Sequence, residues 1–287
     1  MKRWGARRPV PLTTRADHAP WVIAHRGDSA DVAEHTLAAY VAAIEVGADG
    51  LECDVRMTRD GHLVCVHDRR VERTSNGTGT VSDYDLAELE QLDFASWRMD
   101  WPESADDLIS DNPYLRGVRP ERVSPGGGVL TLDELLGLAA DAGRPVRLAI
   151  ETKHPTRYAG LVEKELVRTL RRFGHPAPVP PTEQLVAVMS FAPVALRRVR
   201  LLAPALPTVL LHRKPPVETP PTGTRIVGPS VEAVRADPTG VERVHARGDQ
   251  VWVWTVDEPD DVEFVLGLHP EAIITNRPRD VLRARTR

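Results

Sequence analysis

The 287-residue chain has only two cysteines, Cys53 and Cys65, which are too few for a disulfide framework. It also lacks long hydrophobic runs, and none approaches the ~18 apolar residues that indicate a membrane span. The formal net charge is −4, so no overall basic field favours nucleic acid. These absences predict a protein with no nucleic-acid partner and no stable membrane insertion. We expect it to work in a reducing compartment, the cytoplasm.

The first twenty residues, MKRWGARRPVPLTTRADHAP, are basic, but no apolar segment follows the charges as it would in a secretory signal. Their composition is typical of a solvated, disordered tail. We therefore expect the folded domain to occupy residues 21–287.

Short apolar, β-branched runs alternate with helical patterns along that domain. Eight runs are expected to be strands: 21–27, 49–55, 147–153, 185–191, 208–213, 225–230, 251–256 and 272–276. Helix-like segments separate most of them, beginning with EHTLAAYVAAIEVG at 34–47. This alternation predicts the α/β class and a single (β/α)₈ TIM barrel.

One segment interrupts the repeat. Residues 74–130 contain NGTGT, SPGGG and one helix-like stretch, SDYDLAELEQL. Long loops in compact domains are usually functional or mobile, so we expect a small inserted subdomain on the rim of the barrel.

The stretch GLECDVRMTRDGHLVCVHD (50–68) has two strand-like arms around Arg59-Asp60-Gly61. Too few residues separate the arms for a parallel crossover, so we expect an antiparallel β-hairpin after the second strand. A turn centred between residues 59 and 60 places Glu52 opposite His67 and Asp54 opposite Cys65.

In that register the side chains of Glu52, Asp54, Cys65 and His67 share one face of the hairpin. Cys53 projects to the other face, so we expect the two cysteines not to meet.

Ionisable residues also end two other predicted strands, 21–27 and 147–153. In a (β/α)₈ barrel the carboxyl ends of the strands converge on one face, where catalysis takes place. The expected cluster consists of Glu52, Asp54, Glu151, His25, His67, Arg26 and Lys153. So many charges are costly unless a cation and an anion share the site. A hard divalent cation suits three carboxylates, and the lack of Cys–His clusters argues against structural zinc. The alternative is a salt-bridge cluster of the carboxylates with Arg26 and Lys153.

At these residues the chain resembles the glycerophosphodiester phosphodiesterase family. The family motifs occur in order from about residue 22 to 279: AHRG (24–27), EHT (34–36), GADGLECDVRMTRDGHLVCVHD (47–68), IETK (150–153), SF (190–191), WTV (254–256) and IITNRP (273–278). One departure is AEHT, where the family usually has a proline before the glutamate and an asparagine in place of His35. That departure leaves His35 without an assigned role.

The resemblance implies a metal-dependent hydrolase that splits glycerophosphodiesters, as small-molecule substrates, into glycerol 3-phosphate and an alcohol. It implies that Glu52, Asp54 and Glu151 bind Mg²⁺ or Ca²⁺ and that His25 and His67 form the acid–base pair. Imidazoles suit proton transfer near neutral pH. Which histidine is the acid stays open, as does whether water or the substrate's own hydroxyl attacks first.

Arg26 and Lys153 are expected to bind the substrate phosphate, although both also neutralise carboxylates. Phe191 and Trp254 are candidates for the wall of the substrate pocket, with core packing as the alternative. Trp252 is assigned to the core.

Two other functions are weighed. A phospholipase D- or C-like hydrolase acting on lysolipids needs an apolar rim at the mouth, which Trp97 and Trp101 are placed to supply. A catalytically inactive barrel that binds glycerophosphodiesters has no need for two proton-transfer groups, so the histidine pair argues against it.

Overall fold

The structure, a computed structural model, describes residues 19–98, 127–158, 160–180, 183–218 and 223–286. Eight parallel strands close into a barrel, because β1 pairs both with β2 and with β9. The parallel strands are β1 (Trp21–His25), β2 (Gly50–Met57), β4 (Arg147–Thr152), β5 (Val186–Ser190), β6 (Thr208–His212), β7 (Ile226–Pro229), β8 (Gln250–Val253) and β9 (Ala272–Thr275). The predicted (β/α)₈ TIM barrel is confirmed.

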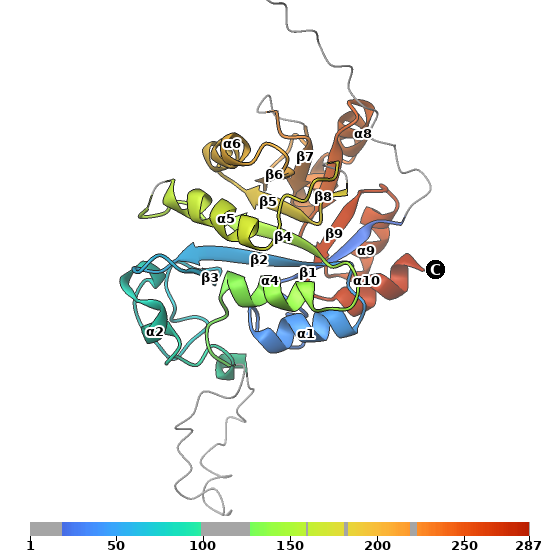
Figure 1. Cartoon of the computed structure of the whole chain (residues 1–287). Coiled ribbons are helices and arrows are strands. Elements are labelled where there is room, and N and C mark those ends of the chain that lie inside the picture. The colour runs from blue at the N-terminus through green and yellow to red at the C-terminus, as the bar shows by residue number, and fades with distance from the viewer. Residues whose placement is uncertain (1–18, 99–126, 159, 181–182, 219–222, 287) are drawn as a thin grey trace, which may run out of the picture.

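Helices surround the barrel (Figure 1). They are α1 (Leu37–Glu45), α4 (Leu132–Ala140), α5 (Leu161–Arg172), α6 (Pro193–Leu202), α7 (Val231–Ala236), α8 (Thr239–Ala246), α9 (Pro259–Leu266) and α10 (Pro278–Arg285). Local sequence sets several of their starts. The Thr36 hydroxyl accepts the Ala39 N–H at the start of α1, and Thr131 and Glu134 form a capping box at the start of α4. In the described part of the chain, no helix is both long and apolar enough to cross a bilayer.

The apolar core has two layers, one inside the barrel and one between strands and helices. The inner cluster includes Ile23, Met189 and Trp252, so the core assignment of Trp252 is confirmed. The larger outer clusters contain residues such as Leu51, Ile150 and Leu166. Since both faces of each strand are covered, the strands are buried along most of their length, as parallel sheets require.

The expected hairpin forms between β2 and β3 (Leu63–Cys65), but its predicted register is wrong by one residue. Val55 pairs with Cys65 and Met57 with Leu63. The turn is centred on Asp60, because the Thr58 N–H donates to the His62 carbonyl at 2.9 Å and Gly61 takes a left-handed φ of 93°. This is a three-residue loop ending in a glycine, a common hairpin connection.

A one-residue shift moves every side chain of a strand to the opposite face. Cys65 therefore lies on the same face as Cys53, and the two thiols meet, contrary to prediction. The hydrogen bond to Cys65, together with burial, raises the pKa of the Cys53 thiol well above its usual range. Both cysteines are buried, and neither forms a disulfide.

The described part of the insertion contains η1 (Val81–Asp83), α2 (Leu86–Leu89) and η2 (Ser96–Arg98). It lies beyond the carboxyl end of β2 (Figure 1). Residues 99–126 of the insertion, with Trp101, and residues 1–18 of the expected tail lie outside the described residues.

Candidate active site

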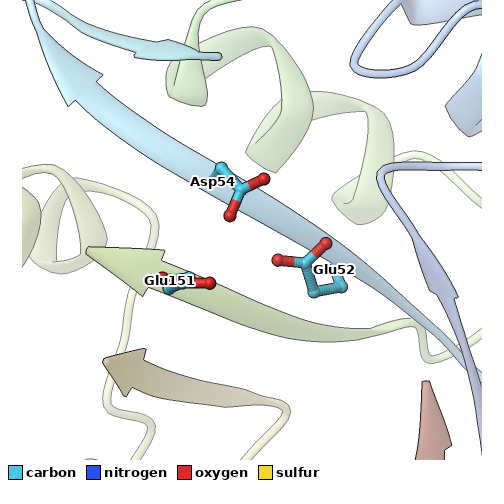
Figure 2. Close-up of side chains that lie close together, drawn as sticks. All are labelled: Glu52, Asp54 and Glu151. Carbon is cyan, nitrogen blue, oxygen red and sulfur yellow. The ribbon is translucent and has the colours of Figure 1, made fainter. Parts of the chain in front are cut away.

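Three buried carboxylates lie together at the carboxyl end of the barrel. Glu52 and Asp54 are two residues apart on β2 and so share a face, and Glu151 is the residue paired with Asp54 on β4. One oxygen from each lies within 4.8 Å of the others (Figure 2). Glu52 Oε1 is buried and has no hydrogen-bond partner. A buried carboxylate oxygen without a partner, next to two more carboxylates, fits a bound cation.

The three carboxyl groups titrate differently because their neighbours differ. Burial and the charge of Asp54 raise the pKa of Glu52 well above its usual range. The same two causes raise the pKa of Glu151 to about 7. Burial also opposes ionisation of Asp54, but Lys153 and the other donors around it hold its pKa well below the usual range.

Two cations contact the carboxylates directly. Lys153 Nζ lies 2.8 Å from Asp54 Oδ1 and 2.8 Å from Glu151 Oε2. Arg26 Nε lies 3.0 Å from Asp54 Oδ2, and its Nη1 lies 3.1 Å from Glu34 Oε1. In this structure both side chains thus neutralise carboxylates, as the salt-bridge alternative expects.

His25 is the last residue of β1, and its ring is hydrogen-bonded to Asn276, near the C-terminus. Its Nδ1 lies 2.7 Å from Asn276 Oδ1, while the Asn276 amide nitrogen donates to Asp257. The bond to Asp257 uses the amide nitrogen of Asn276 as the donor, so the amide oxygen is the atom that faces His25. Because this oxygen can only accept, His25 carries its proton on Nδ1. Its bare Nε2 faces the carboxylates, 3.9 Å from Glu52 Oε2. Burial and the nearby Arg26 lower the pKa of His25 to about 3.

His67 follows β3 and is half-buried. Its Nδ1 lies 2.7 Å from Asp68 Oδ1, so this nitrogen donates to a carboxylate. Burial lowers the pKa of His67 to about 4, against the attraction of Asp54. The predicted pairing of His67 with Glu52 does not occur, because the ladder ends at Cys65. The ring still lies close enough to Asp54 and Lys153 for their charges to shift its pKa.

His35, to which the sequence assigned no role, lies beside the carboxylates. It is buried, its Nε2 lies 3.0 Å from Asp54 Oδ2, and its Nδ1 lies 2.8 Å from the Tyr40 hydroxyl. That hydroxyl also lies 3.1 Å from the Glu52 carbonyl oxygen. His35 has a φ of 60°, a left-handed conformation that asparagine and histidine adopt more readily than most residues. The substitution of the family's asparagine by histidine is therefore compatible with the backbone.

An aromatic pair lies at the ends of two other strands. Phe191, just after β5, and Trp254, just after β8, pack edge to face with ring centroids 5.4 Å apart. Phe191 is 37% exposed, so it is not packed in the core. The Arg213 guanidinium lies 4.9 Å from the Trp254 ring and 5.2 Å from the Phe191 ring.

The charged residues predicted from the strand ends thus gather in one place, whereas several supporting residues were missed. Asn276, Asp257 and Tyr40 hold the histidines, and Arg213 contacts the aromatic pair. Asn276 ends the strand-like run AIITN, and its position at a strand end was the available signal. Tyr40 lies within a helix and carries no comparable signal.

The model of the Glycerophosphoryl diester phosphodiesterase family matches residues 25–280, which is nearly the whole chain. The chain belongs to this family. A "Probable glycerophosphodiester phosphodiesterase 1" of Mycobacterium tuberculosis is 45% identical over 263 residues, covering 90% of each chain. A "Glycerophosphodiester phosphodiesterase" of Caldanaerobacter subterraneus is 33% identical and covers 91% of this chain and 96% of that one.

Solved structures of the family share the barrel. An Oleispira antarctica phosphodiesterase in complex with the product sn-glycerol-3-phosphate superposes with a TM-score of 0.75 at 22% identity, covering 94% of this chain and 98% of that one. At this identity the likeness shows the fold. Together with the family match, the relatives confirm the prediction of an enzyme of the phosphodiesterase class rather than an inactive binding protein.

Proposed function

We propose that the chain hydrolyses glycerophosphodiesters to glycerol 3-phosphate and an alcohol, with a divalent cation held by Glu52, Asp54 and Glu151. The observation that carries this proposal is the set of three buried carboxylate oxygens within 4.8 Å of one another, in a chain of this family. Oxygen ligands without cysteine suit Mg²⁺ or Ca²⁺. When bound, such a cation polarises a phosphoryl oxygen and orients the substrate.

The two histidines are proposed as the proton-transfer pair. His25 presents a bare Nε2 because its Nδ1 proton is given to a neutral amide, Asn276. His67 donates to the Asp68 carboxylate, which stabilises an imidazolium better than an amide does. We therefore assign His25 as the base that takes a proton from the nucleophile, whether this is water or the substrate's own hydroxyl. His67 is then the acid that protonates the leaving alkoxide.

The remaining predicted site residues have positions that suit substrate binding. Lys153 and Arg26 already touch the carboxylates, so each is placed to reach a phosphate oxygen that approaches the cation. The half-exposed face of Phe191, with Trp254 behind it, offers an apolar wall for the glycerol carbons.

The direct test of this function is turnover of glycerophosphocholine, followed by release of glycerol 3-phosphate. We expect one equivalent of glycerol 3-phosphate per choline released, loss of activity with EDTA, and recovery when Mg²⁺ or Ca²⁺ is added back. Full activity after exhaustive chelation would remove the cation from the mechanism. Absence of turnover on any glycerophosphodiester would contradict the function itself.

A lysolipid substrate is the second candidate, and exposed apolar side chains near the mouth favour it. Phe191 is 37% exposed, Val194 at the start of α6 is 58% exposed, and Trp97 in the insertion is 37% exposed. Comparing kcat/KM for glycerophosphocholine and lysophosphatidylcholine separates the two. A higher kcat/KM for lysophosphatidylcholine would identify the lysolipid, rather than glycerophosphocholine, as the preferred substrate.

His35 is proposed to hold Asp54 in the orientation that the cation needs. Outer partners of metal ligands typically contribute ten- to a hundredfold in metal affinity. We expect His35→Ala to weaken cation binding, measured by calorimetry, by about this factor. His35→Asn should restore part of it, because asparagine tolerates the left-handed backbone and still donates a hydrogen bond. The control is His62→Ala on the exposed hairpin turn, and equal affinity in all variants would contradict the role.

A cytoplasmic location is also proposed, as the expectation from the two cysteines. Cys53 and Cys65 are neighbouring thiols that form no disulfide. Adjacent reduced thiols are typical of reducing compartments.

A further inference from the structure

A small basic cavity lies beside the carboxylate cluster. It has a volume of about 30 Å³ and is lined from β2, from η1 with the segment before it, and from the loop between β4 and α5. Its basic lining residues are Arg56, Arg69, Lys153 and Arg157, and no acidic residue lines it. We call the three arginines the basic subsite. Lys153 links it to the carboxylates, since its Nζ lies 2.8 Å from Asp54 Oδ1.

Arg56 is the member closest to the reaction centre in the chain. Together with Glu52 and Asp54 it occupies alternate positions on β2, so all three side chains share one face of the strand. The Arg56 Nε and Nη2 donate to the His67 carbonyl oxygen at 3.0 and 2.8 Å. Among the described residues, no carboxylate lies within ion-pair distance of this guanidinium. Arg56 is half-buried, and burying a cation whose hydrogen bonds go to a carbonyl oxygen rather than to an anion is costly.

The outer members of the basic subsite have little neutralising charge around them. Arg157 Nη1 lies 3.0 Å from Asp83 Oδ1, and both groups are largely exposed. Arg69 is exposed, and the structure gives it no ion pair within the described residues. Asp68, the other nearby acid, already pairs with Arg73 and His67. Three arginines therefore line the cavity, and of the nearby acids only Asp83 forms an ion pair with one of them, Arg157, within the described residues.

We propose that the basic subsite binds an anionic group on the alcohol half of the substrate, so that the enzyme prefers glycerophosphodiesters whose alcohol carries a carboxylate or a second phosphoryl group. This proposal rests on the proposed function and specifies its substrate class. A cavity of about 30 Å³ has room for roughly two water-sized probes, enough for a carboxylate. The glycerol half carries no charge that the arginines would bind, and the aromatic pair Phe191 and Trp254 offers it an apolar wall.

Glycerophosphoserine and glycerophosphoethanolamine test the idea, because they differ only by one carboxylate and both release glycerol 3-phosphate. We expect kcat/KM to be about tenfold higher for the serine diester, the size of one charged hydrogen bond. The preference should shrink as salt is added, since Arg69 and Arg157 are exposed.

The double variant Arg69→Gln/Arg157→Gln should bring the ratio of the two kcat/KM values toward one. Arg168→Gln is the matched control, because Arg168 is also exposed and paired with one acid, Glu165, on the outer helix α5. It should keep the wild-type ratio. If the wild type turns over both diesters without preferring serine, or if the double variant keeps the wild-type ratio, the basic subsite is wrong while the proposed function stands. If neither diester nor glycerophosphocholine is turned over, the proposed function fails and the subsite with it.

Discussion

Glu52→Gln is expected to lose cation binding and turnover together. The glutamine keeps the shape of the side chain but removes one of three negative ligands, so we expect at least about a hundredfold weaker cation binding. Since a bound cation supplies several kcal/mol of transition-state stabilisation, kcat should fall by at least about 10³-fold. Calorimetric titration with Mg²⁺ and Ca²⁺, beside steady-state turnover, measures both effects.

The same variant makes a prediction that needs no activity. The pKa of Glu52 in the folded, cation-free protein lies well above its usual 4.5 because of burial and Asp54. The neutral carboxyl group of Glu52 therefore contributes to the free energy of unfolding at low pH. This contribution is lost as the pH rises through the pKa of Glu52 in the folded protein. At pH 8 the cation-free Glu52→Gln protein should melt above the wild type, and added cation should no longer raise its Tm.

Glu45→Gln, on the exposed end of α1, is the control for this experiment. It should leave cation affinity, turnover and Tm near wild-type values. A Glu52→Gln protein that binds the cation with native affinity would contradict the ligand assignment. One that melts below the wild type without cation would contradict the electrostatic account.

His67→Ala is expected to lower kcat by about 10²- to 10⁴-fold, the usual contribution of a general acid. The affinities for cation and substrate should stay close to those of the wild type, because His67 interacts with Asp54 only by long-range electrostatics. The decisive measurement uses a glycerophosphodiester of p-nitrophenol, whose anion leaves without protonation. His67→Ala should regain most of its activity on this substrate.

His25→Ala should stay slow on both substrates, since the base is needed whatever group leaves. His62→Ala removes an exposed histidine of the same hairpin and serves as the control. Equal rescue of His25→Ala and His67→Ala by the p-nitrophenyl diester would contradict the assignment of acid and base. Near-native kcat of His67→Ala on glycerophosphocholine would exclude His67 from proton transfer.

Much of the fold followed from periodicity. Parallel barrel strands are buried on both faces, so they appear as short apolar runs, and the helices between them have a different period. The ends of these runs carried the ionisable residues, and the barrel topology alone places such ends on one face. This is why His25, Glu52 and Glu151 were predicted to lie together although about 100 residues separate Glu52 from Glu151.

The hairpin register was not recoverable in the same way. A two-residue and a three-residue turn fit the letters TRDGH equally well, and the choice depends on the left-handed Gly61. The one-residue difference reversed the faces of β3. As a result Cys65 lies beside Cys53. His67 lies near the carboxylates from a position after the end of β3, outside the β2–β3 pairing.

By itself the sequence determined the barrel, the set of carboxylates and the presence of two histidines, since burial patterns and strand ends are local properties of the chain. Only the tertiary structure decided which nitrogen of His25 faces the carboxylates and which residues His35 contacts. The physical reason is that a tautomer is set by the partner of the other nitrogen, and for His25 that partner, Asn276, lies 251 residues away. Contacts of this kind depend on the closed barrel, which brings its first and last strands side by side.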